Sequence, residues 1–395
     1  MKQTLIQVAI LFVGLSFQSC AHVPHERAVA SLNPSEIDSL WVQVGKNKDS
    51  MVRSNAVHFW AWMAANGNEK FGNVLAHRGP VTGDPHFFNF GDIHSEGGSS
   101  GLALIDIDDA GSGPLLLDFV RYSLFVKYYL QQKSATENFE LLQSQMFSAY
   151  RDGLAKNKRS MPLVLQTAVQ KSRKKLEKEH AAWVSEFLDD IAHEDYGLRK
   201  KALDLDDLSK ISPDDADAAY QLEKQLLAEN KLLKIYDIAH TKNKSGSSAG
   251  LNRFWFSILA LNESHQILEC KQLTKPATEY YEPQLASEPR IDKVLNSYSD
   301  FRTKDNFVMI LNSLAYWCRP REFKLLKRGQ IEKLAVPETK ELALYFAHWL
   351  GAKQSLQPAG AGLQAQLSSD KTLLQRINQT LKVYDAEMDR LSVRK

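Results

Sequence analysis

Cysteine is scarce in this sequence, with three residues among 395. Cys20 stands at the end of an apolar leader, whereas Cys270 and Cys318 each lie in an apolar run typical of a buried strand. Two isolated cysteines provide neither the disulfide framework of a small secreted domain nor a cluster of thiolate ligands for a metal. We therefore expect Cys270 and Cys318 to be buried free thiols.

The sequence also lacks an excess of charge of either sign. It has 49 lysines and arginines against 47 aspartates and glutamates, for a formal net charge of +2. No overall field therefore draws the chain toward nucleic acid or another polyanion. Basic residues do cluster locally at 156–159 and 171–175, where they are typical of solvated helix faces. We expect no nucleic-acid partner.

Long apolar runs are missing except at the very start of the chain. The run from Leu5 to Phe17 follows Lys2 and is too short to span a bilayer comfortably. This combination is typical of a secretory signal peptide, which we assign to residues 1–20. Residues 21–50 then form a polar tether.

The end of the leader, Ser19-Cys20, resembles the lipobox of bacterial lipoproteins. The resemblance implies that Cys20 is lipidated, becomes the mature N-terminus and makes the only membrane contact. Ala21 in the next position suits the periplasmic face of the outer membrane in a Gram-negative cell. The alternative is an ordinary signal peptide that is cleaved nearby.

Periodicity in the remaining chain indicates an α+β protein that is rich in helix. Apolar residues recur every three to four positions in 119–235, and helices are also predicted over 338–352 and 370–390. Ser212, followed by Pro213, is a good N-cap. Strands are predicted at Phe254–Leu259, Ile267–Lys271 and Ala315–Arg319, so we expect a small antiparallel sheet late in the chain.

The most unusual local pattern is Gly83-Asp84-Pro85-His86-Phe87-Phe88-Asn89, followed by Leu104-Ile105-Asp106-Ile107-Asp108-Asp109. An Asp and an Asn five residues apart on a tight loop can direct two oxygen ligands into one space. A carboxylate after the next apolar run can complete a Mg²⁺ site, because magnesium prefers hard oxygen donors together with phosphates and water. Phosphoryl transfer needs such a site, a base and a nucleotide-binding cation.

These residues resemble the catalytic loop and metal-binding segment of aminoglycoside-phosphotransferase-like kinases. The resemblance implies that Asp84 is the catalytic base and that Asn89 and Asp106 bind the metal. Asp108 is a second candidate metal ligand that spacing does not separate from Asp106. Two further residues are expected to support the loop, namely Asp118, in Leu117-Asp118-Phe119, and His86.

The span from Gly83 to Tyr122, with Asp118-Phe119-Val120-Arg121, also resembles the bacterial family known as domain of unknown function 2252. The likeness extends more weakly from about residue 50 to about residue 330. That family places its glycine-rich loop and lysine after the catalytic loop. Here the turn with Gly246, Ser248 and Gly250, in Ser-Gly-Ser-Ser-Ala-Gly-Leu-Asn-Arg, and Lys271 are the matching nucleotide-binding candidates.

The resemblance implies a protein-kinase-like two-lobe fold over 51–395 in circularly permuted order, with Mg²⁺ and ATP as cofactors. Its parts are a catalytic-loop and helical part (51–240), a glycine-loop and lysine sheet (241–330) and C-terminal helices (331–395). Ser247 replaces a family glycine, and His58-Phe59-Trp60 stands where the family tends to carry Phe-x-Arg-Gly. Glu279 and Glu282 are candidate partners for Lys271. The Arg-Glu segment around Arg319, Arg321 and Glu322 has no assigned role.

Three functions remain open at this point. The first is nucleotide-dependent phosphotransfer to a small-molecule or protein hydroxyl, with an unknown acceptor. The second is a degenerate, non-catalytic kinase-like lipoprotein that binds a ligand or partner at the cell envelope; export, away from cytoplasmic ATP, and Ser247 favour it. The third is a metal-dependent hydrolase using His77, His86 and His94, whose spacings of nine and eight residues do not match a short metal site.

Overall fold

The structure is a computed structural model that describes residues 32–41, 48–94, 100–133, 139–171, 187–188, 196–242, 250–300, 306–320 and 328–393. The leader with Cys20, the tether up to residue 31, and the turn at 243–249 with Gly246 and Ser248 lie outside the described residues. Within the described ranges, no helix is both long and apolar enough to cross a membrane.

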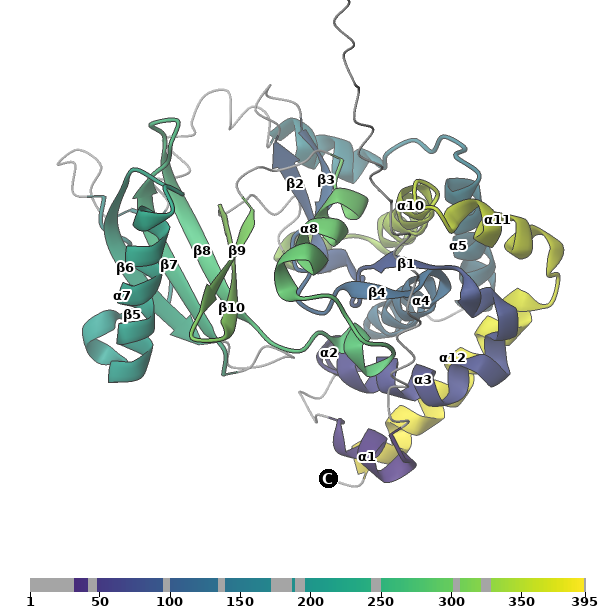
Figure 1. Cartoon of the computed structure of the whole chain (residues 1–395). Coiled ribbons are helices and arrows are strands. Elements are labelled where there is room, and N and C mark those ends of the chain that lie inside the picture. Colours follow the sequence, from purple (N-terminus) through teal and green to yellow (C-terminus); the bar gives the residue numbers. More distant parts are fainter. Residues whose placement is uncertain are drawn as a thin grey trace, which may run out of the picture.

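The chain folds into a helical body and an antiparallel sheet (Figure 1), so the expected α+β class is confirmed. The body is built from both ends of the chain. Its helices are α1 (Pro34–Ser39), α2 (Lys48–Ser54), α3 (Ala56–Phe71), α4 (Leu115–Gln132), α5 (Phe139–Leu154), α9 (Arg328–Glu332), α10 (Val336–Gln354), α11 (Gly360–Ser369) and α12 (Leu373–Val393). One large core of buried apolar and aromatic side chains joins them.

Helices α5 and α10 pack against each other at two glycines. A Cβ on Gly153 would lie 2.1 Å from the carbonyl oxygen of His348, and a Cβ on Gly351 would lie 2.1 Å from that of Tyr150. Because such distances are far below van der Waals contact, only glycine lets the two backbones approach this closely.

The six-stranded sheet has the order β5-β6-β7-β8-β10-β9, and every neighbouring pair is antiparallel. Its strands are β5 (Asp206–Asp207), β6 (Lys234–Lys242), β7 (Asn252–Leu259), β8 (His265–Leu273), β9 (Phe307–Leu311) and β10 (Leu314–Pro320). The predicted strands within β7, β8 and β10 are thus present. Strands β5 and β6 belong to the same sheet, although they precede residue 241.

Helix α7 (Pro213–Ala228) covers one face of this sheet and gives it a second core. The side chain of Ser212 accepts a hydrogen bond from the backbone N–H of Asp215, which confirms the predicted N-cap. Ala219, Leu222 and Leu226 are spaced by three and four residues, so they share the helix face that packs on the sheet.

Two expectations about local structure were wrong. Cys270 and Cys318 are opposite each other on β8 and β10 and form a disulfide rather than two thiols. Pairing brings together cysteines that are 48 positions apart, which no spacing rule reveals. The second is the block 73–121, whose sequence predicts strand and loop: its residues 115–121 form the first turns of α4, a helix in which apolar side chains and the polar Asp118 and Arg121 alike are buried.

Two small two-stranded antiparallel sheets accompany the helical body, and β2 and β3 lie on its side that faces the six-stranded sheet (Figure 1). Strands β1 (Arg78–Val81) and β4 (Gly111–Pro114), which are distant in the chain, form one, and the hairpin of β2 (Phe90–His94) and β3 (Ser100–Leu104) forms the other. Helix α8 (Ser287–Tyr298) packs beside them. The segments that follow β1 and β3 carry the candidate site residues.

Candidate functional site

The loop with Asp84 begins at a position that only glycine can occupy. Gly83 has φ +76°, and a Cβ there would lie 2.0 Å from the carbonyl oxygen of Asp109. Trp60 of α3 fixes the same residue, because its indole Nε1 donates a hydrogen bond to the Gly83 carbonyl oxygen over 2.8 Å. The chain therefore leaves β1 in one tight turn that presents Asp84.

Asp118 supports this turn from the first turn of α4. Its carboxylate is fully buried and accepts hydrogen bonds from the backbone N–H groups of Thr82 (2.7 Å) and Gly83 (3.1 Å). Burial raises the pKa of Asp118 to about 7, although the two N–H donors oppose the rise. The residue has the contacts expected of a side chain that braces the loop.

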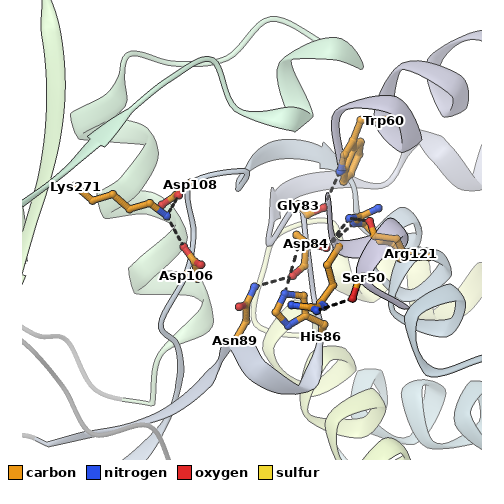
Figure 2. A network of polar contacts seen from close by, with 12 residues as sticks. Ser50, Trp60, Gly83, Asp84, His86, Asn89, Asp106, Asp108, Arg121 and Lys271 are labelled. Carbon is orange, nitrogen blue, oxygen red and sulfur yellow. Dashed lines mark hydrogen bonds and ion pairs between the residues drawn. The ribbon is translucent and has the colours of Figure 1, made fainter. Parts of the chain in front are cut away.

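Asp84 is paired with a buried arginine. Nε and Nη2 of Arg121 lie 2.8 and 2.6 Å from Oδ1 of Asp84, and Nε2 of His86 lies 3.4 Å from Oδ2. Burial alone would raise the pKa of Asp84, but the adjacent Arg121 and His86 outweigh it and lower the pKa. Asp84 is therefore an ionised carboxylate held in one orientation (Figure 2).

Asn89 and Asp106 are brought together by the β2–β3 hairpin. Phe90 pairs with Leu104 at the base of the hairpin, and the backbone N–H of Ile105 donates to the carbonyl oxygen of Asn89 over 2.8 Å. Asp106 therefore directly follows Ile105, the backbone partner of Asn89. Nδ2 of Asn89 donates to the Asp84 carbonyl oxygen over 2.9 Å, which ties the hairpin back to the loop.

Lys271 reaches the same segment from the sheet. Its Nζ lies 3.1 Å from Oδ1 of Asp106 and also pairs with Oδ2 of Asp108 (Figure 2). The lysine side chain is 3% exposed, whereas that of Asp106 is 46% exposed, so the cluster opens to solvent on the Asp106 side. Burial raises the pKa of Asp108, while Lys271 and two nearby arginines overcome burial and lower that of Asp106.

A second ion-pair group lies beside Lys271 on the same sheet. Glu269 is two residues before Lys271 on β8, so both side chains point to one face. The fully buried Glu269 carboxylate pairs with Arg253 of β7 (3.0 Å) and Arg319 of β10 (3.1 Å). Arg319 also donates through Nη1 to the carbonyl oxygen of Ile105, and so joins the sheet to the segment that carries Asp106.

The structure therefore gathers most of the predicted site residues. Asp84, His86, Asn89 and Asp118 form one group, and Asp106, Asp108 and Lys271 form the other. Gly250 is the exposed residue just before β7. The candidate partners of Lys271 pair elsewhere: Glu282 pairs with Arg78, and Glu279 pairs with Lys275. Both glutamates follow the end of β8 in the chain.

Three parts of the site were missed by sequence reasoning. These are the Arg121 pair with Asp84, the Trp60 contact with Gly83, and the Glu269–Arg319 pair. The only available signals were that Arg121 follows Asp118 by three positions on one helix face, and that Glu269 and Lys271 alternate on a strand. The hypothesis of a metal site built from these histidines gains no support. Nε2 of His77 lies 2.7 Å from the side-chain oxygen of Gln366. Among the described residues, His77 and His86 do not converge on a common metal position. The side chain of His94 lies outside the described residues.

A large cavity lies away from this chemistry. It has a volume of about 680 Å³ and is lined by α3, α8 and the 280–285 segment, including Arg78, Tyr281 and Lys293. The catalytic and metal candidates do not line it. The Tyr281 ring packs edge-on against Trp60, whose indole contacts Gly83, so one aromatic wall separates the cavity from the Asp84 loop.

The fold and the site define a protein of helices and antiparallel sheet with two groups of ion pairs. One group surrounds Asp84 on its loop, and the other surrounds Lys271 on the sheet. The family described as "Uncharacterized protein conserved in bacteria (DUF2252)" matches residues 50–293, and the chain belongs to it. The match includes every candidate from Asp84 to Lys271 but not Arg319 or α10–α12. No curated protein and no solved structure matches the chain.

Proposed function

We propose that this protein is a Mg²⁺-dependent phosphotransferase of the cell envelope with a circularly permuted, kinase-like arrangement of two lobes. It would transfer a phosphoryl group from a nucleotide to a hydroxyl of a small molecule or protein. The observation that carries the proposal is the path from Asp84 through Asn89 and the β2–β3 hairpin to Asp106, met from the sheet by Lys271 (Figure 2).

The order of parts along the loop supports this function. Protein kinases use a catalytic-loop Asp, an Asn that binds metal and a further metal-binding Asp, together with a strand lysine that contacts the nucleotide. Here Asn89 follows Asp84 by five residues, and the hairpin places Asp106 next to Asn89. An ionised Asp84 held by Arg121 would orient the acceptor hydroxyl, which suits a reaction that depends mainly on positioning and electrostatics.

The sheet supports the same function. Lys271 lies on the third strand of the series β6, β7, β8, as does the kinase lysine. The predicted nucleotide-binding residues Gly246 and Ser248 fall between the first two strands in the sequence. Helix α8 lies between β8 and β9 in the chain. Its buried Arg290 donates to the Asp108 carbonyl oxygen over 3.1 Å, so the helix contacts the metal-binding segment.

The residues present fit Mg²⁺ with hard oxygen donors. Asp106 is half exposed, and Oδ1 of Asp108 is buried without a hydrogen-bond partner among the described residues. Asn89, Asp106 and Asp108 would hold the ion, which when bound would neutralise phosphate oxygens. Lys271 would then release the carboxylates of Asp106 and Asp108 and bind phosphate oxygens instead. Arg319 would keep Ile105 and the adjacent Asp106 in place.

The disulfide supports the envelope location. Disulfides persist in oxidising compartments such as the periplasm and are rare in the bacterial cytoplasm. Cys270 and Cys318 are fully buried and joined, which agrees with the secretory leader. Lipidation at Cys20 would anchor the protein, with the outer membrane as the proposed destination.

The test is the melting temperature of the protein with and without Mg²⁺-ATP, together with release of ADP. We expect saturating Mg²⁺-ATP to raise the melting temperature by a few degrees. Asp106→Ala should abolish the rise, and Asp84→Asn should keep it but lower ADP release on the order of 10²- to 10⁴-fold. Asp217→Asn on the exposed face of α7 is the matched control. A folded protein whose melting temperature ignores Mg²⁺-ATP would contradict the proposal.

One observation favours a second candidate function, a non-catalytic kinase-like binding protein. Lys271 pairs with two of the three proposed metal ligands, Asp106 and Asp108. A protein in which Lys271 never releases them would not catalyse phosphotransfer. In that case Mg²⁺-ATP or another ligand would raise the melting temperature, with no ADP released by the wild-type protein. Release of ADP that Asp84→Asn abolishes would exclude this candidate.

A further inference from the structure

A group of metal-ligating side chains lies far from the Asp84 loop, where α1, α3 and α12 meet. Figure 1 shows α1 beside the C-terminal part of α12. Asp38 of α1, His58 of α3 and Glu387 of α12 each offer one donor atom, and these atoms lie within 4.8 Å of one another. Three segments that are distant in sequence thus converge on one point.

His58 is the central residue of this group. Its side chain is fully buried, and its Nδ1 lies 2.9 Å from the hydroxyl oxygen of Tyr384. Its Nε2 is buried without a hydrogen-bond partner among the described residues, a situation that is rare in proteins and calls for an explanation. Burial lowers the pKa of His58 to about 4, so the ring is neutral at pH 7.

A neutral ring with this partner can serve as a metal ligand. When Nδ1–H donates to the Tyr384 hydroxyl, the lone pair lies on Nε2. Histidines that bind metals commonly donate their other ring N–H to a protein group in this way, which fixes both the tautomer and the ring orientation.

The two carboxylates already require a cation. Arg390, one turn beyond Glu387 on α12, donates to Oδ2 of Asp38 over 2.9 Å and to Oε2 of Glu387 over 2.7 Å. Its side chain is 35% exposed, so the guanidinium can turn into solvent. Two carboxylates and one arginine leave a net charge of −1, whereas two carboxylates and a divalent cation are neutral.

We propose that Asp38, His58 and Glu387 form a site for a divalent transition-metal ion, with Zn²⁺ as the best match, which Arg390 vacates on binding. An imidazole nitrogen with two carboxylate oxygens suits zinc, whereas Mg²⁺ and Ca²⁺ prefer oxygen alone. Donors around tetrahedral zinc are roughly 3.3 Å apart at usual bond lengths, so modest side-chain rotations complete the site. Water would supply the fourth ligand.

Of the three ligands, His58 lies within the family-matched residues 50–293, and Asp38 and Glu387 lie outside them. Bound metal would clasp α1 to α3 and α12, and so fix the point where the tether enters the body. The inference does not depend on phosphotransfer.

The test is direct measurement of zinc binding to the purified protein, with a chromophoric chelator as competitor. We expect one tight zinc ion per chain. Glu387→Gln and His58→Phe, which keep the side-chain volume approximately, should each weaken binding at least tenfold. Tyr384→Phe should weaken zinc binding about tenfold, because the hydroxyl that holds the proton of His58 on Nδ1 is removed. Arg390→Gln should strengthen it, because the competing cation is gone.

The control is Asp385→Asn, on the same helix, whose carboxylate pairs with Lys48 and Lys127. Its zinc affinity should equal that of the wild type, and so should that of Asp106→Ala in the other site. Two results would overturn the proposal. One is the absence of zinc binding in both the wild type and Arg390→Gln. The other is binding that His58→Phe and Glu387→Gln leave unchanged.

Discussion

The Asp84 loop and the Lys271 sheet are held in different ways. Asp84 is fixed by Arg121, only 37 positions away, and by backbone hydrogen bonds within one packed core. Lys271 meets Asp106 across 165 positions, and Arg319 meets Ile105 across 214. These contacts are ion pairs and single hydrogen bonds between the sheet and the segment that follows β3, where Lys271 is buried and Asp106 is 46% exposed.

This difference indicates which side of the site would change when a ligand binds. Buried contacts at Asp84 are costly to break, so this side is set before any ligand arrives. Ion pairs at Lys271 can be exchanged for a metal and phosphates without exposing a core. The loop is therefore preorganised, and the sheet side is the part that a ligand rearranges.

Loss of Arg121 should have the largest effect. Arg121→Ala leaves the Asp84 carboxylate buried without its guanidinium, and we expect a loss of about 3–5 kcal/mol in the free energy of unfolding, measured in urea. Adding Asp84→Ala should recover part of this loss. Lys382→Ala removes an exposed pair with Glu140 and should cost at most about 1 kcal/mol. Equal effects of Arg121→Ala and Lys382→Ala would contradict the claim that the contact between Arg121 and Asp84 is costly to break.

Loss of Lys271 should have a smaller effect that depends on metal. Lys271→Met leaves Asp106 and Asp108 without their cation, and the half-exposed Asp106 limits the loss to about 2 kcal/mol. Millimolar Mg²⁺ should restore part of the stability, which thermal unfolding with and without Mg²⁺ measures. Lys275→Met, at an exposed lysine nearby, is the control. A loss that Mg²⁺ leaves untouched would argue against an exchangeable cation at this position.

The smallest effect concerns Asp109, between the two regions. Burial, together with repulsion from Asp84 and Asp108, raises its pKa to about 6, above the unfolded value of about 3.9. The folded state therefore holds this proton more tightly, and the stabilisation present below about pH 4 is lost as the pH rises through 6. Asp109→Asn should thus gain about 1–2 kcal/mol relative to the wild type between pH 4 and pH 7. Parallel pH profiles from urea unfolding would contradict this assignment.

Local features of the fold were readable from the sequence. Alternation and turn residues located β7, β8 and β10, and Ser212 marked the start of α7. These features depend on neighbours within a few residues. Local spacing also predicted that Asn89 and a carboxylate after the next apolar run could come together, and the unpredicted β2–β3 hairpin brings their segments side by side.

Contacts between distant segments were not readable. The Cys270–Cys318 disulfide, the Arg319 contact with Ile105 and the meeting of Asp38 with Arg390 join residues that are 48, 214 and 352 positions apart. Whether a polar residue finds such a partner depends on how the cores pack. The Arg121 pair was missed for a related reason, because a helical arginine after an aspartate usually faces solvent.

The position of the sheet within the chain has a consequence for synthesis. Residues 206–320 are inserted between α5 and α10, so the helical body stays incomplete until the last helices leave the ribosome. Phe87 and Phe90, which flank the Asp84 loop, pack on Phe346 of α10, the latter as a stacked pair. A nascent chain that ends at residue 293 would contain the whole family-matched segment but would lack α10, and with it the stacking partner of Phe90. Helix α10 therefore completes the packing around a loop that precedes it by more than 240 residues.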